Sequence, residues 1–207
     1  MTQESPGRQT VTARTSEVGG LGPADRKSSG VRSSGDMLLT YDLTAVAADV
    51  EEVVRNAGGW LCDRARAGWQ VTVLVPPGSD TRALTILGLR AGNWEPGESV
   101  LGPEPPAAVA VGADVLDHHD RLRREVLAGV GGAGIEITVW GESPLFAADP
   151  RFGRVQHPLS VAARAFKARA LRPSGTPSAL PAVEQFRSCA LWYPPEGSDL
   201  VPVSSSR

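Results

Sequence analysis

The sequence predicts an α/β fold, with one domain in which a mostly parallel sheet is flanked by helices. Between residues 37 and 172, short runs rich in Val, Leu and Ile alternate with longer segments of helical periodicity. This alternation is typical of βαβ units, in which parallel strands carry helices on both faces of the sheet. The chain has 207 residues, 41% of them hydrophobic and 21% charged, and this composition suits a single globular core with appendages.

The first half of this region contains two expected strands and two expected helices. The strand segments are rich in β-branched and aliphatic residues, and the longer helical segment places its apolar side chains on one face. Thr44 and Asp80 are natural N-caps for the two helices. In chain order we expect a strand at residues 37–43, a helix at 45–67, a strand at 70–75 and a short helix at 81–87.

The second half repeats the alternation after a loop rich in Gly and Pro. Here we expect a strand at residues 107–112, a helix at 114–128, a strand at 135–140 and a helix at 158–171. The last helix has an apolar stripe that includes Phe166, whereas its basic residues, Arg164, Lys167, Arg169 and Arg172, spread over a face expected to be solvated. Together the elements predict a single Rossmann-like domain over residues 37–172, whose ligands bind beyond the carboxyl ends of the strands.

Both tails of the chain are expected to be disordered. Residues 1–36 combine Ser, Thr, Gly and scattered charges without apolar periodicity, so they cannot offset the entropy lost on ordering. Residues 173–207 form a Pro-rich tail, in which the repeated prolines prevent long regular elements. One apolar patch in this tail, residues 189–193, either docks on the core or adds an edge strand.

Composition and charge limit the partners and the location of the protein. The formal net charge of -2 argues against a broad nucleic-acid footprint. No segment approaches the roughly 18 apolar residues that span a bilayer, and the polar start of the chain does not resemble a secretory signal. Cys62 and Cys189 lack metal-type spacing and are expected to be reduced thiols. We therefore expect a cytoplasmic protein with no membrane contact, no metal site and no identifiable cofactor, for which a protein partner or a small nucleotide remains open.

Acidic residues follow three of the expected strands. Asp80, Asp114 and Glu142 each come just past a strand, and the carboxyl ends of parallel strands lie at one edge of a sheet. Carboxylates in that position can bind Mg²⁺ or orient a phosphate, and Arg82, close to Asp80, is a further ligand-binding candidate. Asp80 and Asp114 are also good N-caps, which is the simpler explanation of both.

The string Asp117-His118-His119-Asp120 combines imidazoles with carboxylates, which serve as metal ligands and as general acids or bases. It resembles the motif that names the DHH phosphoesterases, although the other acidic motifs of that family are absent. In the expected helix His119 falls on the apolar face and His118 on the polar face, so the two cannot hold one metal ion. A buried or half-buried His119 beside a solvated row of charges is the favoured interpretation.

Trp94 lies in the loop GNWEPGE between the two halves of the domain, whereas Trp60 and Trp140 belong to expected core elements. An exposed tryptophan can anchor a protein partner or a ligand. Trp94 is therefore the candidate residue for partner binding.

Two resemblances concern longer segments. AGGWLCDRARAGWQVTVLV resembles the helix and second strand of nucleotide-sugar glycosyltransferases, and this likeness transfers no catalytic residue. The combined pattern GGWLCDRARAGWQVTVLV, TRALTILG, IEITVWGE and HPLSVAARAFKARAL is similar to uncharacterised proteins of actinobacterial type, over most of the core. That resemblance implies a source and a fold unit but no activity.

Two hypotheses about function follow from the sequence. The lack of a coherent catalytic constellation, beside two long polar tails, favours a non-enzymatic regulatory or adaptor protein whose domain is a binding module. The alternative is a small nucleotide- or phosphate-handling enzyme that uses Asp80, Asp114 and Glu142. Convergence of these three carboxylates in one concave pocket would favour the enzyme.

Overall fold

A computed structural model of the chain describes residues 31–33, 39–130, 134–172, 180–189 and 199–203. Most of the expected N-terminal arm, and the apolar patch beyond Cys189, lie outside these residues. The strands are β1 (Val31–Ser33), β2 (Leu39–Val46), β3 (Gln70–Val75), β4 (Arg90–Asn93), β5 (Ala108–Gly112), β6 (Glu136–Trp140), β7 (Gly153–Pro158), β8 (Val183–Ser188) and β9 (Val201–Pro202). The helices are α1 (Val50–Asn56), α2 (Gly58–Arg66), α3 (Arg82–Ile86), α4 (Ala113–His118), α5 (Asp120–Gly129), α6 (Pro144–Ala148) and α7 (Val161–Ala170). Within these segments, no helix combines the length and the apolar character that crossing a membrane requires.

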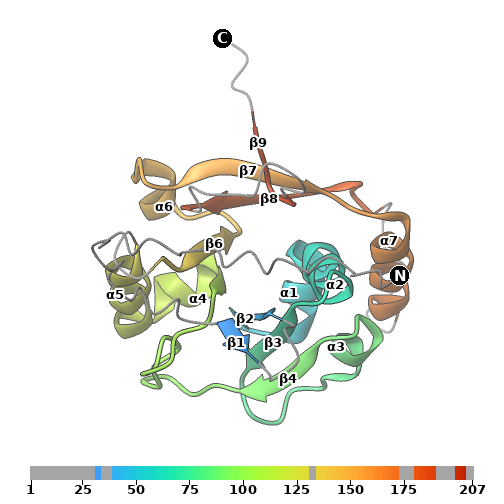
Figure 1. Cartoon of the computed structure of the whole chain (residues 1–207), viewed down its shortest axis with the longest axis horizontal. Coiled ribbons are helices and arrows are strands. Elements are labelled where there is room, and N and C mark those ends of the chain that lie inside the picture. The colour runs from blue at the N-terminus through green and yellow to red at the C-terminus, as the bar shows by residue number, and fades with distance from the viewer. Residues whose placement is uncertain (1–30, 34–38, 131–133, 173–179, 190–198, 204–207) are drawn as a thin grey trace, which may run out of the picture.

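The sheet has a parallel part and an antiparallel extension (Figure 1). The parallel part has the order β4-β3-β2-β5-β6, and β8, β7 and β9 continue it with antiparallel pairing, while β1 pairs with β2. In the parallel part, the winding of the chain reverses between β2 and β5, as it does in Rossmann-type sheets. The predicted fold class, a Rossmann-like α/β sheet flanked by helices, is confirmed.

Side chains of the central strands alternate between two buried cores. Ala45 and Ala110 belong to the core covered by α1, α2, α3 and α7, whereas Val46 and Val109 belong to the core covered by α4, α5 and α6. Figure 1 shows these two groups of helices on either side of the sheet. Burial on both faces is what makes these strands continuous apolar runs in the sequence.

Strand β2 ends later than the sequence predicted. Its last residue, Val46, is fully buried and pairs with both β3 and β5. The helix expected to follow Thr44 begins instead after Asp49, its N-cap, and divides at Ala57 into α1 and α2. A short apolar run suits a strand and a helix equally well, and pairing at the centre of the sheet selects the strand. The shift brings Asp49 and Glu52 to the carboxyl end of β2.

The antiparallel extension contains a segment that was expected to be part of the C-terminal tail. Strand β8 lies between β6 and β7, so the sheet continues beyond residue 172. The inward-facing residues of β8 include Glu184, whose side chain is 1% exposed. The strand therefore lacks the apolar alternation by which a half-buried strand is recognised.

Helix α7 turns a different face to the core than the sequence predicted. Lys167, expected to be solvated, is fully buried, and Phe166, expected in the apolar stripe, is 40% exposed. Lys167 Nζ donates to Glu184 Oε1 at 2.5 Å and to the main-chain oxygen of Arg55 at 2.6 Å. The buried lysine is tolerated because a carboxylate from β8, a strand not expected from the sequence, compensates its charge.

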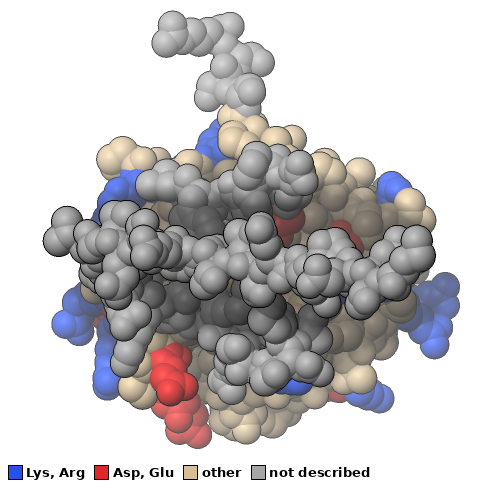
Figure 2. Space-filling view, viewed as in Figure 1, with Lys and Arg blue, Asp and Glu red and all other residues tan. Residues whose placement is uncertain are grey.

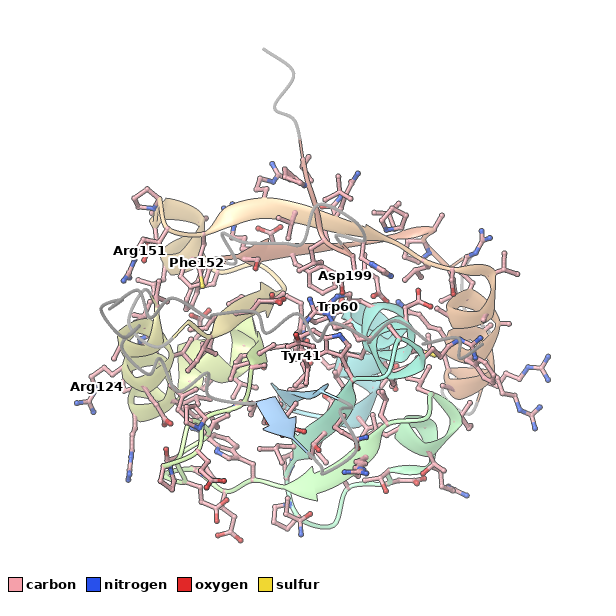
Figure 3. The ribbon with its side chains drawn as sticks, viewed as in Figure 1. Tyr41, Trp60, Arg124, Arg151, Phe152 and Asp199 are labelled. Carbon is pink, nitrogen blue, oxygen red and sulfur yellow. The ribbon has the colours of Figure 1, made fainter. Side chains whose placement is uncertain are left out.

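The segment that leads into β9 is fixed by a second buried ionic contact. Asp199 accepts hydrogen bonds from Trp60 Nε1 at 2.8 Å and from Arg64 Nε at 2.5 Å (Figure 3). Arg64 is only 4% exposed and also reaches Glu136, at 2.8 Å. Two buried basic side chains, Arg64 and Lys167, thus attach the C-terminal strands to the rest of the fold.

Candidate functional site

A pocket of about 420 Å³ opens at the carboxyl ends of β2, β3, β4 and β5. This is the crevice where the strand order reverses, the usual ligand site of such sheets. Its polar lining groups are Asp114, His118 and His119. The rest of the wall is apolar: Ala47 and Ala48 follow β2, Pro76 and Pro77 follow β3, Trp94 and Pro96 follow β4, and Val115 lies on α4. We call this space the strand-end pocket.

Asp114 and His118 form a pair on one face of α4. They are four residues apart, so their side chains are neighbours on the helix surface. Nδ1 of His118 lies 2.7 Å from the main-chain oxygen of Asp114 and 3.3 Å from its carboxylate. Because both partners are acceptors, the tautomer with its proton on Nδ1 satisfies them, and in that tautomer Nε2 is left as an acceptor. The His118 side chain is 72% exposed, so water and a substrate can reach Nε2.

Glu52 is a half-buried acid beside the same strand ends. Its Oε1 accepts hydrogen bonds from Trp140 Nε1 at 2.5 Å and from Asn56 Nδ2 at 3.1 Å, whereas its buried Oε2 has no partner among the described residues. Burial raises the pKa of the Glu52 carboxyl, and the charges of Asp49 and Asp114 raise it further. The two hydrogen bonds act in the opposite direction without cancelling the rise. Glu52 therefore holds a proton more readily than an ordinary glutamate does.

Trp94 forms part of the pocket wall. The expectation of an exposed side chain is wrong, because Trp94 is only 5% exposed and packs in the core under α4 and α5. Its Nε1 donates to the main-chain oxygen of Glu98 at 3.3 Å, and its ring meets the edge of His119 with centroids 5.1 Å apart. These contacts hold the loop after β4 against the break between α4 and α5.

The two neighbouring histidines of this region point to different partners. The helix expected over residues 114–128 is interrupted at His119, which ends α4 and precedes α5. His119 packs on Trp94, while His118 contacts Asp114. In the part of the chain that the structure describes, no group of three or more His, Cys, Asp or Glu side chains is placed to hold a metal ion.

The structure brings only one of the expected ligand-binding residues to the strand-end pocket, Asp114. Asp80 and Arg82 pair with each other at 2.5 Å in exposed positions after β3, and hydrogen bonds from Arg82 hold the pKa of Asp80 below its ordinary value. Glu142 lines a separate cavity beside β7 and β8. The three carboxylates do not converge, so the enzyme site expected from Asp80, Asp114 and Glu142 is not formed.

Sequence reasoning missed Asp49 and Glu52 as site residues. A helix beginning after Thr44 would place both on its outer, solvated face. In the structure Asp49 is the N-cap of α1, and its Oδ1 accepts from the backbone NH of Glu52 at 2.7 Å. Asp-x-x-Glu is the spacing of a capping box, and this signal would have placed the start of the helix correctly.

Comparison with known proteins identifies relatives of the fold. No family model matches the chain, and no curated protein matches it significantly. Among solved structures, a triple mutant of a deacetylase involved in the teicoplanin biosynthetic pathway is 14% identical, with a TM-score of 0.50, over 80% of this chain and 100% of that chain. A deacetylase–teicoplanin complex from the same pathway is 13% identical, with a TM-score of 0.50 over the same shares. The 4-carboxy-2-hydroxymuconate hydratase of Pseudomonas putida is 12% identical, with a TM-score of 0.43, over 76% of this chain and 99% of that chain.

The likeness to the deacetylases shows a common fold, and it contradicts the prediction of a non-enzymatic regulatory or adaptor protein. The deacetylases that share this fold are enzymes, which contradicts the description as a binding module and favours the alternative prediction, an enzyme. The lack of a contiguous motif in the sequence does not imply a lack of catalytic groups. The strand-end groups come from two separate segments, around Glu52 and around Asp114, and no contiguous motif joins them.

Proposed function

We propose that the protein is a hydrolase that removes an acetyl or similar acyl group from an amine, with the strand-end pocket as its active site. One observation carries the proposal: His118, oriented by Asp114, lies at the same strand ends as Glu52, an acid with a buried and unpartnered oxygen. The fold shared with deacetylases supports this class of reaction.

In the proposed reaction, water attacks the carbonyl carbon of an N-acyl substrate. Nε2 of His118 takes one proton from the water as the new oxygen–carbon bond forms. The carbon–nitrogen bond then breaks, and the leaving nitrogen receives a proton, so that the products are a carboxylate and an amine. Asp114 stabilises the imidazolium formed in the first step, because the Nδ1 proton stays directed at its oxygens.

Glu52 supplies the acid of this reaction. Its raised pKa makes the protonated carboxyl more available than in an ordinary glutamate. We infer that a bound substrate brings its leaving nitrogen to the unpartnered Oε2, which is buried and lies outside the residues that line the pocket, and takes the proton from that atom. Trp140 holds the other oxygen in place through Oε1. Glu52 and His118 thus have opposite roles, acid and base, set by their different environments.

The charges around the pocket fit a neutral amide better than a phosphate. Its lining contains no Lys or Arg but includes the carboxylate of Asp114, whose charge also acts on the nearby carboxyl of Glu52. An anionic phosphate would be repelled there, whereas an amine product that gains a proton is stabilised. The apolar wall around Trp94 provides a surface for the ring or chain that carries the acyl group.

The test is release of acetate by the full-length protein from a panel of N-acetylated amines that includes N-acetylglucosamine and N-acetylated teicoplanin. We expect His118→Gln to lower kcat by about 10²–10⁴-fold, the usual worth of a general base. Asp114→Asn is expected to lower kcat less, because His118 keeps its main-chain partner. Asp80→Asn is the matched control, since Asp80 follows a strand but lies outside the pocket.

Two results would overturn the proposal. One is that no substrate of the panel releases acetate with the folded protein. The other is that His118→Gln and Asp80→Asn have the same kcat as the unchanged protein, since water activation would then not depend on this histidine.

The thiols bear on the location of the protein. Cys62 is buried and Cys189 is half-buried, and both are free cysteines. Free thiols are typical of proteins kept in a reducing compartment. On this basis we propose that the protein acts in the cytoplasm.

A further inference from the structure

A second cavity, of about 170 Å³, lies beside the antiparallel extension of the sheet. Its walls come from the turn after β6, from the paired strands β7 and β8, and from Val203 after β9. The charged and amide side chains that line it are Glu142, Arg154, Gln185 and Arg187. We call this cavity the β7–β8 groove.

Arg154 and Arg187 stand directly opposite each other in the groove. They are partners in the antiparallel register of β7 and β8, and Val139 of β6 continues the row beyond Arg187. Opposite residues of such a pair have Cβ atoms about 5 Å apart and project from the same face. Like charges in this arrangement repel each other and destabilise a sheet, so the pairing requires an explanation.

Neither guanidinium group is neutralised by the described part of the chain. Arg154 is exposed and Arg187 half-buried, and no side-chain hydrogen bond or ion pair joins either one to a described residue. Other surface arginines behave differently, as Arg151 shows by pairing with Asp149 at 2.6 Å. The surface is not generally basic, because the net charge is -2 and the basic side chains seen in Figure 2 lie scattered around the periphery.

The other polar groups of the groove indicate which further contacts a ligand can make. Gln185 is exposed and can donate from its amide nitrogen. Glu142, the acid in the lining, is also exposed and lies outside ion-pair distance of both arginines. Two positive charges against one negative charge leave the groove positive. The carboxylate of Glu142 is free to accept a hydrogen bond from a hydroxyl or ammonium group next to a bound anion.

We propose that the β7–β8 groove binds the phosphate group of a small molecule between Arg154 and Arg187. Guanidinium groups match phosphate oxygens with paired hydrogen bonds, and a phosphate between the two side chains replaces their repulsion by attraction. The volume of about 170 Å³ admits the phosphate and the atoms next to it. This site is separate from the strand-end pocket, whose lining has no Lys or Arg, and it does not depend on the proposed hydrolysis.

The experiment is a titration of the full-length protein with inorganic phosphate at constant ionic strength. Binding is monitored by calorimetry and by the chemical shifts of the backbone amides. We expect saturable binding with shifts on β7 and β8, and a loss of affinity of about tenfold or more in Arg187→Gln. Arg124→Gln, on α5 and outside the lining of the groove, is the matched control and keeps the affinity; Figure 3 labels this arginine. Glu142→Gln is expected to tighten phosphate binding, because it removes the one negative charge of the lining.

Thermal unfolding gives an independent readout. Without phosphate and at low ionic strength, Arg187→Gln is expected to raise the Tm, because one of two repelling charges is gone. Phosphate is expected to raise the Tm of the unchanged protein but not that of this variant. If Arg187→Gln does not fold, Arg187→Lys keeps the charge and is expected to bind phosphate more weakly, since it lacks the paired donors.

Three results would overturn the inference. The first is phosphate binding that does not saturate, and the second is an equal loss of affinity in Arg124→Gln and Arg187→Gln. The third is acetate binding as tightly as phosphate, which would contradict the assignment to a phosphate group.

Discussion

Glu184 and Glu52 show how differently the two halves of the sheet use acidic side chains. Glu184, on β8, has both oxygens engaged, by Lys167 and by the backbone NH groups of Gly59 and Trp60 at 2.9 and 2.8 Å. Glu52, at the end of β2, has one oxygen engaged and one buried oxygen without a partner among the described residues. A buried polar atom left unpaired costs about 1–3 kcal/mol, so its presence needs a reason.

The acids of the antiparallel half stabilise the fold, whereas those at the strand ends belong to the proposed active site. In the antiparallel half, acids are neutralised by buried bases: the buried Glu184 pairs with Lys167 and the half-buried Asp199 pairs with Arg64. At the parallel strand ends, Asp114 lines a pocket that has no Lys or Arg in its lining, and Glu52 lies close enough for the charge of Asp114 to act on it. Substitutions in the first half should therefore change the free energy of unfolding, and those at the strand ends should change activity.

The largest effect on stability is expected for Lys167→Met. The substitution keeps much of the side-chain volume but leaves the carboxylate of Glu184 buried without its cation, and such a loss typically costs about 3–5 kcal/mol. The measurement is the free energy of unfolding in urea. Arg169→Met, on the exposed side of the same helix, is the control and should change it little.

A double variant tests whether the lost stability comes from the unpaired charge of Glu184. Lys167→Met combined with Glu184→Gln removes both charges, so part of the lost stability should return. A loss below about 1 kcal/mol for Lys167→Met alone would mean that the backbone NH groups of Gly59 and Trp60 are enough to stabilise the buried carboxylate of Glu184. The ion pair with Lys167 would then contribute little to stability.

A smaller effect, of about 1–3 kcal/mol, is expected for Asp199→Asn, which weakens the contacts to Trp60 and Arg64. Burial acts to raise the pKa of Asp199, but hydrogen bonds and charge from Arg64 prevail and lower it. The folded-state pKa is thus below the ordinary value of 3.8, so this stability is fully present above that value and is lost as the pH falls through the lowered pKa.

The matching measurement compares Asp199→Asn with the unchanged protein at about neutral pH and in acid well below the ordinary pKa of aspartate. The gap in unfolding free energy should narrow as the pH falls. Asp120→Asn, which removes an exposed carboxylate that pairs with Arg123, should open no comparable gap. A gap that stays constant in acid would show that packing, rather than charge, holds this segment.

The sequence allowed most of the parallel half of the fold to be predicted, with the exception of the edge strand β4, but not the antiparallel half. The strand at Gln70–Val75 was located correctly, because alternate strand positions bury apolar residues and leave a local pattern. Strand β8 leaves no such pattern, since Glu184 faces inward. Its burial depends on Lys167, which lies 17 residues away in the chain, and a local pattern cannot reveal that compensation.

The candidate site was predicted only in part, for a related reason. Asp114 was found because it directly follows a strand. Glu52 was assigned to solvent because the run ending at Val46 suits a helix as well as a strand, and the sheet partners of that run decide between them. His118 was placed correctly on a polar helix face, yet its link to Asp114 becomes meaningful only once the pocket is known.

The smallest change in stability is expected for Glu52→Gln. This variant also distinguishes most clearly between the role of Glu52 and the role of Glu184. The raised pKa means that the folded protein holds this proton above the ordinary value of 4.5, so stability falls as the pH rises from that value through the raised pKa. Glu52→Gln cannot ionise and should lack that fall, which leaves it equal or more stable than the unchanged protein at neutral pH, by roughly 1 kcal/mol at most.

The same variant should lose most of its activity, because the amide cannot give a proton to the leaving nitrogen. Activity and unfolding in urea are measured on one preparation, with Glu184→Gln as the control that should lose stability instead. If Glu52→Gln were destabilised at neutral pH as strongly as Lys167→Met, Glu52 would be a structural acid like Glu184. An active and equally stable Glu52→Gln would instead remove Glu52 from the chemistry and leave His118 without its acid partner. Only a loss of activity with retained stability supports the proposed division of the sheet, in which Glu184 is a structural acid paired with Lys167 and Glu52 is an acid of the active site.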